Sequence, residues 1–496
     1  MKQLRLIALL MALLFLTTGL TSCLNGLLPN KDVTTQADTS EISSDEAVST
    51  VQTEPKFLNG VALEAYTIIY SIDDVDYSKR AATYIQEQIT QLTNIELEVK
   101  KDTDGSFAHE IVVGETSREI SDTLNADMDD LQFAILADDA HIAMEGDYFV
   151  IAAAAYFFIE TYIMANTTDV QIPKEVRVHD PIVKEAKNFI LLIGDGMGVN
   201  QTRLFETFDV ATEGDLAYSD GEDIFYGYML PYQGLARTTS LSGTTDSAAG
   251  GTALATGYKT VNSRIGRDKD YKDIQSLTEL AGSLGKSTAV MSTDSATGAT
   301  PAAFSAHADN RSDSDVIRES QDALKKKYGT SIYCGFSDYD QTGINTLEYR
   351  LRKTLTKLAT NENGFFMMYE EAHIDKHSHN SEMEKTFNAL VRFNQAIGVF
   401  MEFVFYHPET ALVITADHET GGLQINNDGE FYYTSAQNSE GTRNHTGAAV
   451  PVFAYGADME SFHDQEVENV EIPKLFAKLW GVEDFGGPIH AYDYFL

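Results

Sequence analysis

From about residue 187 to the C-terminus, short apolar runs alternate with segments whose apolar side chains recur every three or four positions. In residues 277–284 these positions form a helical stripe that ends at Gly285, and a strand-like run follows. Such alternation is typical of a mostly parallel sheet covered by helices on both faces, so it predicts an α/β fold. Apolar runs of strand length occupy residues 188–192, 288–291, 365–369 and 411–415.

Residues 57–180, here called the N-terminal domain, carry a second pattern that predicts a small α+β domain. A helical stripe spans residues 81–92, and an apolar helix is expected over residues 152–164. This domain faintly resembles the accessory domain at the front of some bacterial glycoside hydrolases, and it holds no cluster of catalytic residue types. A glycan-binding or spacer role and a purely packing role both remain open. Strands are expected at residues 67–70, 111–114, 133–135 and 148–151.

The first 23 residues have the features of an export signal. Residues 1–5 are basic, residues 6–15 are almost wholly apolar, and the sequence Leu-Thr-Ser-Cys ending at Cys23 resembles a bacterial lipobox. The apolar run is shorter than the roughly 20 residues that a membrane-spanning helix needs. We therefore predict a lipoprotein signal peptide at 1–22, lipidation of Cys23, and a flexible acidic tether over 23–56.

This prediction places the protein outside the cytoplasm, lipid-anchored to a bacterial membrane on its periplasmic or cell-surface face. A cysteine that merely follows a cleavable signal is the alternative. The formal charge of −39 argues against nucleic acid as a general partner, because nucleic-acid binding requires positive patches.

A serine in a run of small residues is the strongest candidate for a nucleophile. Ser247 follows Asp246 and precedes Ala-Ala-Gly-Gly-Thr-Ala, a sequence that suits the start of a helix. Free backbone N–H groups and the positive end of the helix dipole favour an anion there. A simple capping role for this segment is the alternative, because Ser and Asp are common helix caps.

Acidic and histidine residues follow several of the predicted strands. Asp195 comes after one strand between glycines, and Asp417 and His418 come after another. Asp375 and His379 are four positions apart, so on a helix they share a face and can grip one metal ion. Each has a structural alternative, such as a turn residue or a solvated helix start. Their joint occurrence at successive strand ends instead predicts a metal cluster.

In these motifs, the chain from about Lys187 to the C-terminus resembles the alkaline phosphatases. The resemblance implies a three-layer α/β/α sandwich and a phosphomonoesterase that works through a phosphoserine on Ser247 and releases inorganic phosphate. It also implies phosphate monoesters as substrates. The motifs that occur in the family's order are the glycine turn at Asp195, Asp246 with Ser247, residues 299–303 with Arg311, residues 370–379, residues 415–418 and residues 445–447.

The same resemblance implies two Zn²⁺ ions and one Mg²⁺ ion. The first zinc would be held by Asp375, His379 and His445. The second zinc would be held by Asp195, Asp417, His418 and the Ser247 oxygen. The magnesium would share Asp195 and add Thr300 and Glu370. Arg311 would bind two phosphate oxygens with its planar guanidinium, and Lys376 would lie near the phosphate.

Two departures from the family pattern alter this picture. Relatives carry an aspartate or histidine two residues before the threonine, whereas this chain has Gly298, which weakens the magnesium assignment. The segment between His418 and His445 has room only for a hairpin near residues 427–429, so the sequence gives no support for the family's usual dimer and leaves monomer and dimer open. A phosphodiesterase or sulfatase is the enzymatic alternative. The other alternative is a surface lipoprotein that binds glycan or phosphate with weak or lost catalysis.

Overall fold

The computed structural model describes residues 56–72, 75–124, 128–207, 224–335 and 346–487. The predicted signal peptide, Cys23 and nearly all of the predicted tether lie outside these ranges. Among the described helices, none combines the length and apolarity needed to cross a bilayer. Residues 54–496 belong to one compact unit.

A large, mostly parallel sheet forms the core of the C-terminal region, the described part of residues 187–487. Its central strand β10 runs parallel to both neighbours, β14 and β15, and only the pairings of β20 are antiparallel. The strand order is β13 (Ser331–Cys334), β12 (Ser287–Ser292), β14 (Phe365–Glu371), β10 (Asn188–Gly194), β15 (Thr410–Thr415), β20 (Val450–Tyr455), β11 (Tyr232–Arg237) and β21 (Glu466–Glu468). Strands β10, β14 and β15 are buried along their whole length, as their continuous apolar runs predict.

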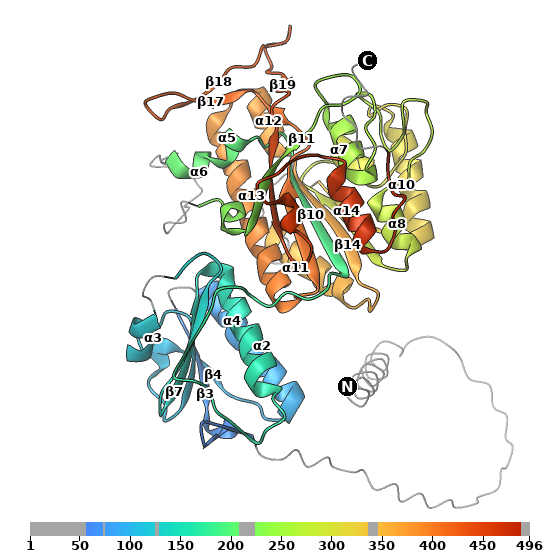
Figure 1. Ribbon diagram of the computed structural model, residues 1–496. Helices are drawn as coiled ribbons and strands as arrows, with labels where there is room; N and C mark the ends of the chain where they lie inside the picture. Colours follow the sequence, from blue (N-terminus) through green and yellow to red (C-terminus); the bar gives the residue numbers. More distant parts are fainter. Residues whose placement is uncertain (1–55, 73–74, 125–127, 208–223, 336–345, 488–496) are drawn as a thin grey trace, which may run out of the picture. The chain divides into compact units, whose positions relative to one another are not determined.

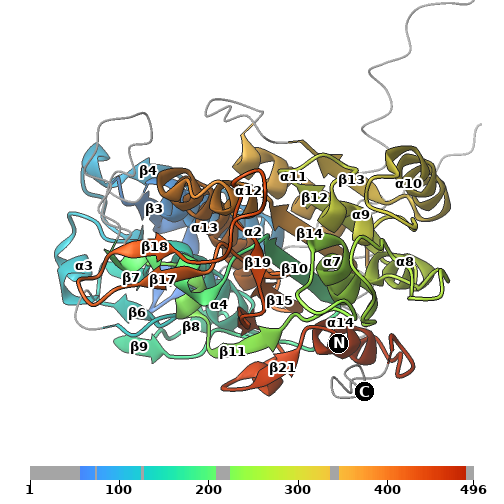
Figure 2. The ribbon, with the colours of Figure 1, turned by 90° about the horizontal axis from the view of Figure 1, so that it is seen from above.

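Helices cover both faces of this sheet (Figures 1 and 2). Helices α7 and α14 lie on one side, while α11 and α13 lie on the other. The three-layer α/β/α architecture predicted from the sequence is thereby confirmed. The helices are α5 (Val199–Thr202), α6 (Leu204–Thr207), α7 (Ser247–Thr256), α8 (Leu277–Ser283), α9 (Ala299–Ala303), α10 (Ser314–Tyr328), α11 (Leu347–Ala359), α12 (His373–His379), α13 (Met383–Tyr406) and α14 (Glu471–Leu479).

The N-terminal domain has its own mixed sheet. Its order is β4 (Val99–Lys101), β3 (Thr67–Tyr70), β5 (Glu110–Val113), β7 (His141–Gly146), β6 (Phe133–Ala137) and β9 (Glu175–Val178). Helices α2 (Val75–Thr93) and α4 (Ile151–Phe158) contact this sheet, and α3 (Glu119–Leu124) packs on β6 and β7. A short sheet of β1 (Phe57–Leu58), β2 (Val61–Ala62) and β8 (Asp169–Val170) completes the domain.

The strand predicted at residues 148–151 is wrong. Residues Tyr148–Val150 form a 3-10 turn that leads directly into α4, and the strand lies upstream at β7. Helix α4 is almost entirely buried, so its sequence is apolar all round and shows no helical stripe. A short apolar run of this kind does not distinguish a buried strand from a buried helix.

Helix α13 joins the two sheets. It packs on β10, β14 and β15 and also contacts α4. Its buried Glu402 carboxylate accepts hydrogen bonds from Arg80 Nε of α2 at 2.8 and 3.0 Å. It also accepts one from Arg352 Nη2 of α11 at 2.6 Å. Close by, the rings of Tyr84 and Tyr406 stack with centroids 4.3 Å apart.

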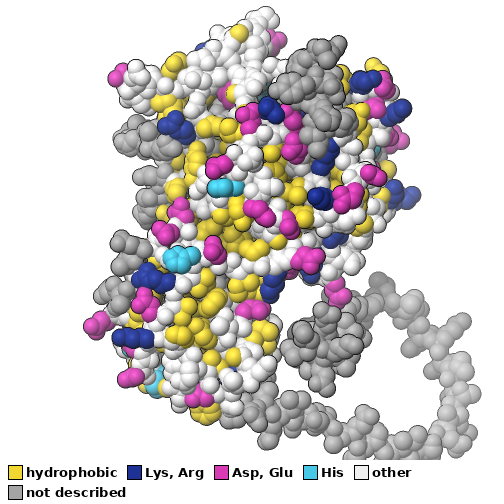
Figure 3. Space-filling view, in the orientation of Figure 1, with side chains coloured by type: hydrophobic (Ala, Val, Ile, Leu, Met, Phe, Trp, Pro, Cys, Tyr) yellow, Lys and Arg dark blue, Asp and Glu magenta, His cyan; other side chains and the backbone are white. Residues whose placement is uncertain are grey.

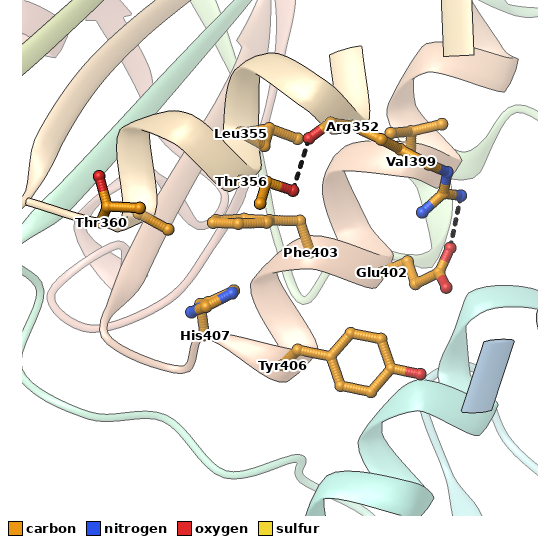
Figure 4. A pocket seen from close by; sticks show the side chains of 10 residues that line it. Arg352, Leu355, Thr356, Thr360, Val399, Glu402, Phe403, Tyr406 and His407 are labelled. Atoms are coloured by element: carbon orange, nitrogen blue, oxygen red, sulfur yellow. Dashed lines mark hydrogen bonds and ion pairs between the residues drawn. The ribbon is translucent and has the colours of Figure 1, made fainter. Parts of the chain in front are cut away.

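An open pocket of about 440 Å³ lies between α11 and α13 next to this ion pair (Figure 4). It ends at His407, just before β15 begins, so it lies at the opposite edge of the sheet from the carboxyl ends of the strands. On the face that Figure 3 shows, basic side chains are scattered among acidic ones.

Candidate active site

Carboxylates from three adjacent strands meet at the carboxyl edge of the large sheet. Asp195 directly follows β10, and Glu370 is the second-last residue of β14. Asp417 comes two residues after the end of β15. The register pairs Ile193 with both Glu370 and Thr415, which brings the three strand ends level. The sequence predicted this convergence because parallel strands end at a common edge.

Ser247 is the first residue of α7, with Asp246 as its N-cap. The Asp246 side chain accepts a hydrogen bond from the Ala249 backbone at 3.0 Å. A Cβ atom at Gly250 would lie 2.8 Å from the Asp417 carbonyl oxygen, so only glycine lets α7 approach the end of β15 this closely. The helix start therefore places Ser247 Oγ 3.1 Å from His418 Nε2.

The rings of His379 and His445 form the second part of the site with Asp375. Nε2 of His379 lies 3.3 Å from Asp375 Oδ1, and Nε2 of His445 lies 3.5 Å from the same oxygen. His379 and Asp375 are one turn apart on α12, as predicted. His445 enters from β19 (His445–Thr446), which pairs with β16 (Glu419–Thr420) directly after His418.

The hydrogen bonds of these rings determine where their protons lie. Nδ1 of His445 faces the Thr245 carbonyl at 2.9 Å, and Nδ1 of His379 faces the Arg443 carbonyl. A carbonyl only accepts, so both Nδ1 atoms carry the hydrogen and both Nε2 atoms offer lone pairs. Those two Nε2 atoms are 3.0 Å apart. Two lone pairs at this distance repel unless a cation or a proton lies between them.

The same reasoning applies to His418. Thr420 Oγ1 donates to Asp375, so it accepts from His418 Nδ1 at 3.2 Å. His418 Nε2 then directs its lone pair at Asp195 and Asp417, whose oxygens lie 3.5 and 3.3 Å away. Burial and the charge of His445 lower the pKa of His418 well below its ordinary value, so the ring is neutral. A neutral imidazole among carboxylates is typical of a metal ligand.

Three buried oxygen atoms at the site have no hydrogen-bond partner among the described residues: Asp195 Oδ1, Asp417 Oδ2 and Thr300 Oγ1. Buried polar atoms are almost always paired, so each orphan needs an explanation. All three belong to the predicted ligand set. The donor atoms of Asp375, His379 and His445, and those of Asp195, Asp375 and His418, lie within 4.8 Å of one another in each group. The residues therefore fit divalent cations.

The pKa shifts of the buried carboxylates also support a cation site. Burial raises the pKa of Asp195 well above its usual range, and the charges of Asp417 and Asp375 add to the effect. Burial likewise raises the pKa of Glu370. Burial alone would also raise the pKa of Asp375, but its hydrogen bond with His445 and the imidazole charges lower it. Crowded buried carboxylates of this kind are stabilised in the ionised form by a bound cation.

Thr300 and Glu370 form the side of the site where the magnesium was predicted. Thr300 is in the first turn of α9, and Glu370 Oε2 accepts a hydrogen bond from the buried Ser292 hydroxyl at the end of β12. A Cβ atom at Gly251 would lie 3.3 Å from Thr300 Cα, so α7 and α9 pack closely here. The structure thus brings Thr300 and Glu370 to the predicted edge.

Arg311 lies beside the nucleophile because Asp246 holds it there. Arg311 Nη1 is 3.3 Å from Asp246 Oδ2, an oxygen that also accepts from the Ser263 backbone at 2.9 Å. The Arg311 backbone N–H in turn donates to Ser263 at 2.8 Å. About 39% of the Arg311 side chain is exposed, which leaves its guanidinium accessible to an anion at Ser247.

The roles of three residues at the site, Asp294, Thr420 and Asp246, were not predicted from the sequence. Lys376 Nζ forms an ion pair with Asp294 at 2.7 Å, although no acidic partner for Lys376 was foreseen. Thr420 orients both Asp375 and His418, and Asp246 positions Arg311. Asp294 could have been noted as an acidic residue just after a predicted strand, and Thr420 as a neighbour of Asp417 and His418 within one motif.

Comparison with known proteins identifies the family to which this chain belongs. A family model described as alkaline phosphatase matches residues 186–335 and 337–443, more than half of the chain. Alkaline phosphatase 4 of Bacillus subtilis is 29% identical over 299 residues, which cover 50% of this chain and 64% of that protein. Alkaline phosphatase 3 of the same organism is 27% identical over 352 residues, which cover 60% and 75%.

The chain thus spans somewhat less than two thirds of the length of alkaline phosphatase 4. The solved structure of the alkaline phosphatase from the Antarctic bacterium TAB5 is 27% identical, with a TM-score of 0.49, and the match covers 60% of this chain and 98% of that one. The N-terminal domain lies outside the family match. On the strength of the family match, this chain belongs to the alkaline phosphatase family.

Proposed function

We propose that this protein is a metal-dependent phosphomonoesterase that releases inorganic phosphate through a phosphoserine on Ser247. The observation that carries the proposal is the position of Ser247 Oγ, which lies at a helix start and within 3.1 Å of a neutral imidazole in a cage of carboxylates. This arrangement supplies a nucleophile, an anion-binding helix end and a cation site within one volume.

The family resemblance implies three groups of metal ligands, and the close clustering of Asp375, His379 and His445 and of Asp195, Asp375 and His418 supports them. One zinc would be held by Asp375, His379 and His445, and a second by Asp195, Asp417, His418 and Ser247. A magnesium would be held by Asp195, Thr300 and Glu370. When bound, such cations favour the serine alkoxide and stabilise charge on the attacking and leaving oxygens of an in-line displacement.

The chain's own groups carry the remainder of the mechanism. Ser247 Oγ forms a bond to phosphorus while the ester P–O bond breaks, and water later cleaves the phosphoserine to free the hydroxyl. Ser247 begins α7, and the positive end of that helix dipole favours the negative charge of a phosphoryl group on this residue. Arg311, held by Asp246, binds two of the non-bridging oxygens with its planar fork.

Arg311 favours a monoester over a diester. A monoester has three non-bridging oxygens that share about two negative charges, whereas a diester has two that share one, so the guanidinium fork attracts the monoester more strongly. This argues against the phosphodiesterase alternative. Three buried oxygens of the implied ligand set have no hydrogen-bond partner among the described residues, and this favours a metal-dependent enzyme over a binding protein without catalysis.

Hydrolysis of a chromogenic phosphate monoester by the full chain in detergent tests the proposal. We expect Ser247→Ala to abolish turnover, and chelation to abolish it until zinc and magnesium are restored. Ser283→Ala is the matched control, because Ser283 ends α8 just before β12 begins, at the far edge of the sheet. Activity that survives both Ser247→Ala and chelation would disprove the mechanism.

We also propose that the protein is exported and anchored by a lipid on Cys23, on the basis of the lipobox-like sequence. In a bacterial host, the protein would then sediment with membranes and take up labelled fatty acid. Cys23→Ala should release it into the soluble fraction. Equal membrane association of both forms would contradict the anchor.

A further inference from the structure

Lys376 is tethered by a carboxylate from another part of the chain. It follows Asp375 on α12, and its ammonium reaches across to Asp294 Oδ1 at 2.7 Å. Asp294 lies in the loop between β12 and α9, and its Oδ1 also accepts from the Ser295 backbone at 2.7 Å. The side chains are 43% and 28% exposed, so the pair lies at the rim of the site.

A chain of hydrogen bonds connects Asp294 to the proposed magnesium ligands. The Asp294 backbone N–H donates to Ser292 Oγ at 2.8 Å, and the Ser292 hydroxyl donates to Glu370. Ser292 is fully buried. The loop that carries Asp294 is therefore linked to Glu370 through the Ser292 hydroxyl.

The position of Asp294 also explains why residue 298 is a glycine. A Cβ atom at Gly298 would overlap Asp294 Oδ2 and lie 2.8 Å from Asp294 Cγ. The backbone of Gly298 has φ −57° and ψ 153°, which any residue adopts. Space rather than conformation thus favours glycine, because the Asp294 carboxylate fills the volume that a side chain at position 298 would occupy and would have to shift to admit one.

We propose that Asp294 is a positioning residue that holds the Lys376 ammonium at the Thr300 and Glu370 side of the site, where Lys376 binds phosphate and supports the magnesium ligands. The carboxylate that is absent at position 298 is supplied from position 294. This inference rests on the proposed phosphatase function. It predicts that a carboxylate is needed at either position 294 or position 298, and that both positions cannot be filled together.

Two binding measurements on the full chain test this inference without turnover. Inorganic phosphate and Mg²⁺ are titrated calorimetrically into the zinc-loaded Ser247→Ala protein, with and without Asp294→Asn. We expect Asp294→Asn to weaken Mg²⁺ binding about 10- to 100-fold, as loss of a group that orients metal ligands typically does. Phosphate binding should weaken as well. Lys376→Met should have a similar effect, and the double variant should be little worse than either single one.

Relocation of the carboxylate separates positioning from general structural damage. Asp294→Ala should lose affinity, and Asp294→Ala combined with Gly298→Asp should recover much of it. Gly298→Asp alone should disturb the site, because it collides with Asp294. Asp315→Asn is the matched control, since Asp315 forms an exposed ion pair with Arg318 at 2.7 Å on α10.

Unchanged Mg²⁺ and phosphate affinities in Asp294→Asn would overturn the inference and leave the phosphatase function intact. Failure of the relocated carboxylate to restore affinity would overturn it too. A Ser247→Ala protein that binds no phosphate even with zinc and magnesium would instead remove the proposed function on which the inference depends.

Discussion

The Nε2 atoms of His379 and His445 face each other at 3.0 Å while both Nδ1 atoms are held by backbone carbonyls. With no cation between them, one ring must take up a proton. Burial opposes protonation of His445, but its hydrogen bond with Asp375 and the charge of that carboxylate raise the pKa of His445 above its ordinary value.

Zinc added to the chelated protein should therefore release protons and stabilise the fold. At a free zinc concentration 1,000 times Kd, the free energy of unfolding should rise by about 4 kcal/mol per site. Thermal unfolding and proton release in weak buffer measure the two effects. His379→Ala should diminish both, and their persistence at full size in that variant would contradict the assigned site.

Gly250→Ala tests the close approach of α7 to β15. The added Cβ would lie 2.8 Å from the Asp417 carbonyl oxygen and would displace Ser247 from His418. A misplacement of about 1 Å can cost about 100-fold in rate, so we expect a loss of that order in kcat. Ala255→Gly, in the same helix, should weaken the fold by about 1 kcal/mol without this loss of rate. Equal kcat in Gly250→Ala and the parent would contradict the packing argument.

Glu402→Ala should destabilise the protein with little effect on hydrolysis. The buried carboxylate pairs with Arg80 and Arg352, and its removal leaves two guanidinium groups without compensation. We expect a loss of about 3 kcal/mol in the free energy of unfolding, at the low end of the range because both arginines keep some solvent contact. Urea denaturation measures it. Glu348→Gln, an exposed partner of the same arginines, should cost less than about 1 kcal/mol.

The pair of His307 and Glu279 should contribute a pH-dependent stability. Their side chains are 3.2 Å apart, and His307 also donates to the Gly266 carbonyl at 2.7 Å. Burial would lower the pKa of His307, but Glu279 raises it above its ordinary value. Burial would raise the pKa of Glu279, but His307 lowers it.

Because the folded pKa of His307 is raised, its contribution is complete below the unfolded value of about 6.5 and is lost as pH rises through the folded value. The contribution from Glu279, whose pKa is lowered, is lost only in acid. His307→Gln should therefore cost about 1.5–3 kcal/mol at pH 6 and less at pH 9. Urea denaturation at both values, with the exposed His463→Gln as control, checks this. An equal cost at both pH values would refute the pairing.

Much of the site was predictable because its parts lie where apolar runs end. Asp195 and Asp417 follow buried parallel strands, and the geometry of a parallel sheet brings such ends together. The spacing of Asp375 and His379 likewise specifies one helical face. The hairpin expected near residues 427–429 is confirmed as β17 (Leu423–Ile425) and β18 (Phe431–Tyr433).

The remainder depends on contacts between distant segments, which no local pattern encodes. The partnership of Asp294 with Lys376 depends on the volume left at Gly298, and the pairing of β19 with β16 brings in His445. The strand prediction at residues 148–151 was wrong for the same reason, because contacts between distant segments decide the structure there. Burial of α4 against α2 and α13 removes the polar face that marks a helix in the sequence.

Helix α13 lies between both sheets, and this has a practical consequence for anyone who trims the chain to the part that matches the family. Deletion of the N-terminal domain would uncover Tyr406 and the Glu402 carboxylate together with the apolar side chains around them. The truncated protein would keep all the proposed metal ligands. It would still be expected to aggregate, because a newly exposed apolar surface favours association between molecules in water.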